Sequence, residues 1–287
     1  MGTSQSSNGS PGGVPMIPPW VAELPPEPDP GAEGTAEEGE ETGTSGEAGS
    51  DAPSEPAVPA GEIPIAPSSR FGGARMNLGN FAATGDSAAM RRGVGQYFKR
   101  GYGGGAVAVG RFRSTARTAA GLFGTLGPGP ATIPGGPLDR AVLAGRSADE
   151  IMDAVVEAVR PVDGTQDSES SRAAIKDALA DLLDRFPDGD LLNLQDDQRV
   201  FAVERFVAID VFRRLQLDLG GVIQERAPTV AAAMSRLKEI REYVRETIAA
   251  SFRVLRETGR QLVSGHISRI VQAAVREAVM VFQGYAE

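Results

Sequence analysis

The chain has 287 residues, a formal net charge of −9, a single His and no Cys. Without Cys it can form neither a disulfide nor a thiol nucleophile, and the usual His/Cys zinc sites are excluded. The first basic residue is Arg70, so no basic secretory signal is expected. No run of about 18 apolar residues predicts a transmembrane helix. We therefore expect a cytoplasmic protein that does not enter a membrane.

Charge is distributed unevenly along the chain. Residues 1–69 contain 12 acidic residues and no basic one, whereas residues 70–138 contain nine basic residues and one acidic one. Residues 139–287 contain 20 basic and 25 acidic residues. Segregation of this kind says more about the partners of the chain than its net charge does. We predict three parts: a tail with an acidic spacer, an Arg/Gly-rich helical hairpin region with a linker, and a helical bundle.

Residues 1–69 are rich in Gly, Pro, Ser, Glu and Ala, and Trp20 is their only aromatic residue. Such a segment cannot bury enough apolar surface to offset a backbone entropy of roughly 1–2 kcal/mol per residue. We predict a long disordered acidic arm. Within it, residues 26–62 form a self-repelling spacer, and about 50 residues of random coil span roughly 40 Å.

The predicted helices begin after the arm. We expect a loop over Arg70–Arg75 and a helix over about 85–100. Gly101–Gly105 then breaks the chain as a tight turn where two backbones approach closely. A second helix is predicted over about 106–126, and the Pro-rich stretch 127–137 is a loop or linker.

The remaining residues have clear helical periodicity. Ser147 and Glu150 fit a capping box, and Pro161 ends the helix that they start. Two later helices are predicted over about 170–186 and about 196–219, the second of which ends at Gly220-Gly221. Another helix follows with Pro228 in its first turn, and a last helix runs to about residue 283. No convincing strand alternation occurs. The predicted fold class is therefore all-α, preceded by the disordered arm.

The usual catalytic patterns are missing. The three lysines, none of which follows Gly, are Lys99, Lys176 and Lys238. A phosphate-binding P-loop is thereby excluded. The single His266 lies beside an apolar helical stripe, where a histidine at the rim of the core is expected. The acid pairs Asp196-Asp197 and Asp188/Asp190 suit helix starts and turns. Spacing alone leaves a carboxylate-only metal site open. We assign no catalytic residue, metal or cofactor and predict that the chain is not an enzyme.

The basic block combines arginines with aromatic residues. Its candidate surface consists of Arg91, Arg92, Tyr97, Arg100, Tyr102, Arg111 and Arg117. Arg and aromatic side chains together can hold phosphates and stack bases. The same residues suit docking of an acidic protein partner or of the chain's own arm, or simply a solvated helix face. We favour a protein partner over nucleic acid, which stays the alternative.

The first residues form a small uncharged tip. Because Gly2 follows Met1, Met removal would leave Gly2 with a free amine. Thr3, Ser4, Gln5 and Ser6 add no charge or bulk. A short apolar island over residues 14–25, with Pro18, Pro19 and Trp20, follows the tip and precedes the spacer. Such a tip can enter a narrow partner pocket, and the competing interpretation is an ordinary disordered start.

Three stretches of the chain have a distinctive pattern of residues. The first runs from Met1-Gly2-Thr3-Ser4-Gln5-Ser6 to Pro18-Pro19-Trp20. The second is Arg70-Phe71-Gly72-Gly73-Ala74-Arg75 with Asn77-Leu78-Gly79. The third runs from Arg91-Arg92-Gly93 through Gly101-Tyr102-Gly103-Gly104 to Thr115-Ala116-Arg117-Thr118-Ala119. Together they resemble the QatB family of the bacterial Qat anti-phage defence system. The resemblance covers the tip and residues 70–126, and the spacer and the C-terminal helices are similar only in character.

The resemblance implies a non-catalytic protein that works with an ATPase, a QueC-like (QatC-type) enzyme and a TatD-like nuclease. The QueC-like partner would bind the N-terminal tail and modify the Gly2 amine with a deazapurine-type group. Gly2, Thr3 and Ser4 carry this implication. It agrees with the exposed, neutral tip that the composition predicts.

Overall fold

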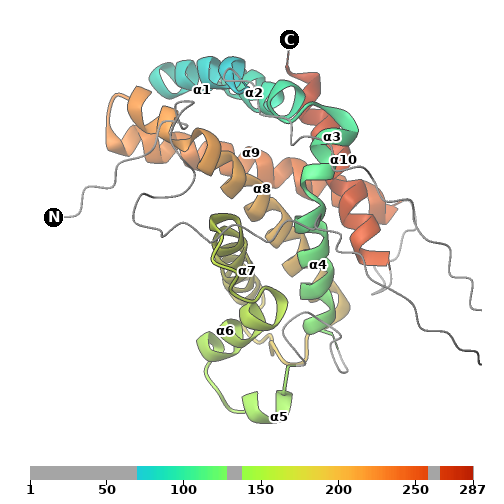
Figure 1. The fold of residues 1–287 in the computed structure, drawn as a ribbon. Coiled ribbons are helices and arrows are strands. Elements are labelled where there is room, and N and C mark those ends of the chain that lie inside the picture. Colours follow the sequence, from blue (N-terminus) through green and yellow to red (C-terminus); the bar gives the residue numbers. More distant parts are fainter. Residues whose placement is uncertain (1–69, 128–137, 258–265, 287) are drawn as a thin grey trace, which may run out of the picture. The chain divides into compact units, whose positions relative to one another are not determined.

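The structure is a computed structural model that describes residues 70–127, 138–257 and 266–286. Within these ranges the regular elements are all helices, which confirms the predicted all-α class (Figure 1). In the same ranges, no helix is both long enough and apolar enough to cross a bilayer. The tail residues Gly2–Ser6 and Pro18–Trp20 lie outside the described residues.

The helices of the described residues follow one another along the chain and belong to one compact unit. Their bounds are α1 Gly72–Thr84, α2 Ser87–Gln96, the π-helical turn η1 Tyr97–Gly101, α3 Gly105–Arg111, α4 Arg113–Thr125, α5 Arg140–Leu143, α6 Ala148–Val159, α7 Gln166–Arg185, α8 Asp196–Arg226, α9 Val230–Glu257 and α10 Ile267–Gly284.

Helix α1 corrects the loop predicted over Arg70–Arg75, because it begins at Gly72. Glycine disfavours a helix locally, but Ala74, Leu78 and Phe81 lie on one side of this one and are buried. These three side chains belong to the same hydrophobic core as the buried side chains of α8, and α1 packs directly on α8. Burial against a distant helix therefore outweighs the local preference for a loop.

The predicted helix over 106–126 is interrupted at Phe112, which separates α3 from α4. The Phe112 backbone leaves helical geometry at φ −96° and ψ 15° while its ring is buried. The turn predicted at Gly101–Gly105 is confirmed. Gly103 and Gly104 have φ of 81° and 69°, a left-handed geometry that favours glycine over residues with a Cβ.

The C-terminal helices confirm several local predictions. Ser147 and Glu150 form the capping box at the start of α6, and α6 ends before Pro161. The expected end of α8 at Gly220-Gly221 is wrong, because the helix continues to Arg226 and buries Ile223. The expected place of Pro228 in the first turn of the next helix is also wrong, because α9 begins at Val230. The Thr229 hydroxyl caps it and accepts from the Ala232 amide at 3.1 Å.

Helix α8 is central to the packing in this unit. It contacts α1, α4, α7 and α9, whereas α10 contacts α2, α3, α4 and α9 (Figure 1). Helices α7 and α8 run antiparallel, with Asp181 beside Arg205 at 3.9 Å and Asp177 beside Arg213 at 2.7 Å. Both predicted ordered segments, 70–138 and 139–287, contribute side chains to one continuous hydrophobic core.

Candidate functional site

Helix α8 carries a polar stripe in its second half. Asp210, Arg214 and Asp218 recur at four-residue spacing, which aligns them along the helix. Asp210 is only 1% exposed, and the other two are half-buried. A buried carboxylate is costly unless it is paired and hydrogen-bonded, so the partners of this stripe define the site.

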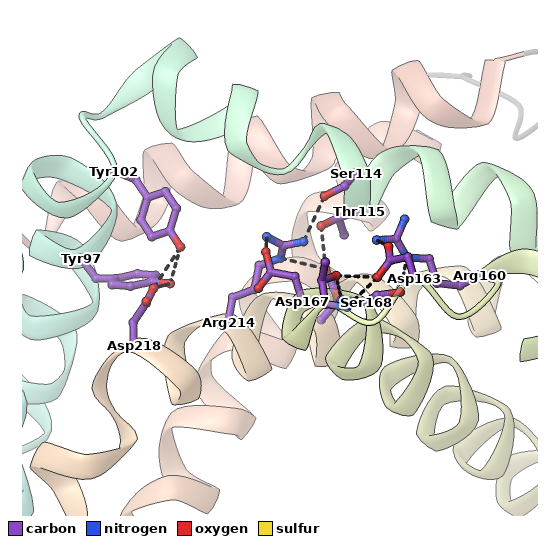
Figure 2. A network of polar contacts seen from close by, with 12 residues as sticks. Tyr97, Tyr102, Ser114, Thr115, Arg160, Asp163, Asp167, Ser168, Arg214 and Asp218 are labelled. Atoms are coloured by element: carbon purple, nitrogen blue, oxygen red, sulfur yellow. Dashed lines mark hydrogen bonds and ion pairs between the residues drawn. The ribbon is translucent and has the colours of Figure 1, made fainter. Parts of the chain in front are cut away.

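Two tyrosines surround the Asp218 carboxylate. The hydroxyls of Tyr97 and Tyr102 lie 2.9 and 3.0 Å from its Oδ2 atom and 3.1 Å from each other (Figure 2). The π-helical turn η1 brings the two tyrosines together, since the Tyr102 amide donates to the Tyr97 carbonyl five residues earlier. Asp218 is thus held by groups from the other end of the unit's sequence.

The environment keeps both phenols protonated. Burial raises the pKa of Tyr97 well above its usual value, and Tyr102 and the negative charge of Asp218 raise it further. Burial followed by Asp218 likewise raises the pKa of Tyr102. Neutral phenols can donate hydrogen bonds to a carboxylate but cannot act as bases near neutral pH. The cluster therefore orients Asp218.

Arg214 connects three helices. Its Nε donates to Asp210 Oδ2 at 3.3 Å, its Nη2 donates to Ser114 Oγ at 3.0 Å, and its Nη1 lies 3.5 Å from Asp167 Oδ2 (Figure 2). The Thr115 hydroxyl also donates a hydrogen bond to Asp210 Oδ2, at 2.6 Å. These bonds attach the starts of α4 and α7 to α8.

A second polar group lies at the connection between α6 and α7. Arg160 donates to Ser168 Oγ at 3.2 Å and to Asp163 Oδ2 at 3.3 Å (Figure 2). The Thr165 hydroxyl and amide donate to Asp163, and these bonds lower the pKa of its carboxyl. This group stabilises the start of α7 and so positions Asp167 beside Arg214.

A pocket of about 390 Å³ opens beside the polar stripe. It is lined by Arg70, Tyr102, Arg111, Ser114, Asp167, Arg214, Leu217 and Asp218. The guanidinium carbons of Arg70 and Arg111 lie 4.9 and 5.5 Å from the centre of the Tyr102 ring. Arg70 is fixed further by a 2.6 Å hydrogen bond from its Nε to the Gly101 carbonyl.

The predicted basic surface is only partly brought together. Tyr102 and Arg111 line the pocket, whereas Tyr97 is fully buried beneath it and cannot stack a base. Arg91 lies over the Tyr285 ring at 5.8 Å, and Arg92 pairs with Asp86 at 3.6 Å. The remaining two predicted residues, Arg100 and Arg117, are exposed and do not line the pocket.

The sequence reasoning missed Arg70, Asp210, Arg214 and Asp218 as site residues. A usable signal existed for three of them, since an acid, a base and an acid recur at four-residue spacing along one helix. Arg70 gave no such signal, because it meets the others only through its bond to Gly101 and the bonds of the two tyrosines to Asp218.

Other candidates carry no clear chemistry. In the described ranges, no group of three or more His, Cys, Asp and Glu side chains is arranged to hold a metal ion. His266 is exposed at the residue before α10. Asp196 and Asp197 occupy the first turn of α8, and the Asp196 carboxylate pairs with Arg199.

A comparison with known protein families identifies the chain. The family model for the "Qat anti-phage system associated protein QatB" matches residues 103–282, well over half of the chain. The match includes the C-terminal helices and part of the third stretch of resemblance, and it begins after the tip and the second stretch. No curated protein and no solved structure matches the chain. The chain therefore belongs to the QatB family of Qat anti-phage system associated proteins.

Proposed function

We propose that the chain is a non-catalytic component of a cytoplasmic Qat defence complex, and that a QueC-like partner enzyme binds its N-terminal tail and modifies the Gly2 amine. The ATPase and the TatD-like nuclease of the system are the other proposed partners. The observation that carries the proposal is the family match over residues 103–282, together with an N-terminal segment of 69 residues that lacks any basic residue.

The charge pattern supports a division of labour within the chain. The tip from Gly2 to Ser6 is uncharged and small, and 12 acidic residues separate it from Arg70. A neutral tip on a self-repelling spacer can reach a partner's active site at little steric cost. The helical unit would then dock the complex.

The bonding of Asp210 supports a non-catalytic role. Its carboxylate is 1% exposed and accepts hydrogen bonds from Thr115 and Arg214. A catalytic base needs a lone pair available to a substrate. The arrangement around Asp210 is instead typical of a network that holds helices together.

Intact-protein mass spectrometry tests the proposal. The chain is produced alone, with its neighbouring Qat genes, and with the QueC-like neighbour inactivated. We expect loss of Met1 in all three samples and an added mass on Gly2 only with the active enzyme. Absence of added mass in every sample would overturn the proposed modification.

Two deletions of 19 residues separate tail binding from nucleic-acid binding. Deletion of residues 2–20 should abolish capture of the QueC-like enzyme, whereas deletion of residues 31–49, a matched length of spacer, should preserve it. Nucleic-acid binding through the Arg-rich block would survive both deletions and weaken steeply with salt. Salt-sensitive binding to nucleic acid without any tail-dependent capture would favour the alternative.

A further inference from the structure

The pocket beside Tyr102 contains two cations without acidic partners. Arg214 is neutralised by Asp210 and Asp167, at 3.3 and 3.5 Å. Arg70 and Arg111, by contrast, form no ion pair within the described residues, although both guanidinium groups lie near the same ring. Two guanidinium groups held beside one pocket favour an anion, because their planar forks can each donate two parallel hydrogen bonds.

The mouth of the pocket is preorganised. The Nε of Arg70 is already bonded to the Gly101 carbonyl. This bond fixes the guanidinium group and leaves its two terminal nitrogen atoms available to a ligand. Tyr102 is fixed through its hydroxyl to Asp218 at 3.0 Å. Side chains that are already ordered lose little entropy when a ligand binds, so such a site can bind a small ligand.

The other residues that line the pocket are not typical of a surface that binds a polyanion such as nucleic acid. Asp167 has a side chain that is 65% exposed at this site, and Asp218 also lines the pocket. These carboxylates would repel the second phosphate of a nucleic-acid backbone. They are suited instead to accept hydrogen bonds from hydroxyl or amino groups of a small ligand.

We propose that this pocket binds a small phosphate monoester, of which a nucleoside monophosphate is the representative chemistry. Arg70 and Arg111 hold the phosphate, and Asp167 and Asp218 accept hydrogen bonds from hydroxyl or amino groups of the ligand. The volume of about 390 Å³ lies within the ordinary range of roughly 300–1,000 Å³ for small-molecule sites. This site is independent of the proposed tail modification.

Isothermal titration of the full chain with AMP, adenosine and inorganic phosphate tests the site. We expect saturable binding of AMP, weaker binding of phosphate and much weaker binding of adenosine. Arg111→Gln should weaken AMP binding about tenfold or more, since it removes hydrogen bonds to a charged group. Arg117→Gln is the matched control, because Arg117 is also exposed but does not line the pocket. It should change the affinity less than twofold.

Arg70→Gln is a second test of the site and should also weaken AMP binding. Circular dichroism checks that each variant is folded. Three results would overturn the site: no saturable binding of AMP, equal binding of adenosine and AMP, or equal losses in Arg111→Gln and Arg117→Gln. A single-stranded oligonucleotide that binds more tightly than AMP, with steep salt dependence, would also overturn it and assign the arginines to backbone phosphates.

Discussion

The two halves of helix α8 are stabilised by different chemistry. Residues 200–209 bury a series of apolar side chains, including Val203, Phe206 and Val207. From Asp210 onward the helix also places carboxylates and a guanidinium group against Thr115, Tyr97 and Tyr102. Apolar burial is non-directional, whereas hydrogen bonds to a buried carboxylate require specific partners. We infer that apolar burial supplies stability along the helix and that the polar groups of the second half fix which segments pack beside it.

The apolar half should give the largest loss of stability. Phe206→Ala removes a fully buried ring and should lower the free energy of unfolding by about 3–5 kcal/mol. Urea denaturation measures the change. Leu217→Ala, on the same helix but 45% exposed, should change it by less than about 0.5 kcal/mol. Similar losses in both variants would contradict the assignment of stability to apolar burial.

The polar half should respond strongly when one partner is removed. Asp210→Ala leaves Arg214 without its nearest buried carboxylate and should cost about 3 kcal/mol. Asp210→Asn keeps an acceptor for the Thr115 hydroxyl and should cost less. A double-mutant cycle with Thr115→Val measures the coupling across the 2.6 Å bond. Additive losses in that cycle would show that the bond contributes nothing specific.

An added methyl group should destabilise the protein where α2 packs closely on α10, but not at a position of α4 that has free space around it. A Cβ added at Gly95 would lie 2.6 Å from the Phe282 carbonyl oxygen, so Gly95→Ala should cost about 1–3 kcal/mol. Gly124→Ala is the control, because nothing lies within 4 Å of an added Cβ there. Reduced backbone entropy should make it stabilising by about 0.5–1 kcal/mol. Thermal unfolding midpoints that move in the same direction for both would contradict this account.

The tyrosine cluster should make the free energy of unfolding fall as the pH becomes alkaline. Because the folded-state pKa of Tyr97 is raised above 10, its contribution is complete below about pH 10 and is lost as pH rises through the folded-state value. Tyr97→Phe should cost about 1 kcal/mol at neutral pH and flatten this alkaline decline. Urea denaturation across the alkaline range measures both effects. An equally steep decline in wild type and variant would assign the pH dependence to other groups, such as Tyr243, whose pKa burial raises to about 12.

Local signals in the sequence predicted much of the C-terminal part. The capping box at Ser147, the helix end before Pro161 and the start of α8 at Asp196 all depend on bonds within a few residues. The same is true of the turn at Gly103-Gly104, where positive φ is a property of the residue type. Such features are predictable because their partners are neighbours in the chain.

The helical class, the segregation of charge and the uncharged tip can be read from the sequence, because these features follow from composition and periodicity. Three other features depend on long-range packing: α1 replaces a loop, α8 continues past Gly220-Gly221, and Arg70 and Arg214 line one pocket. In each of these cases the deciding free energy comes from burial, hydrogen bonding or ion pairing between residues far apart in the chain. Local propensities of about 1 kcal/mol per glycine are smaller than that contribution.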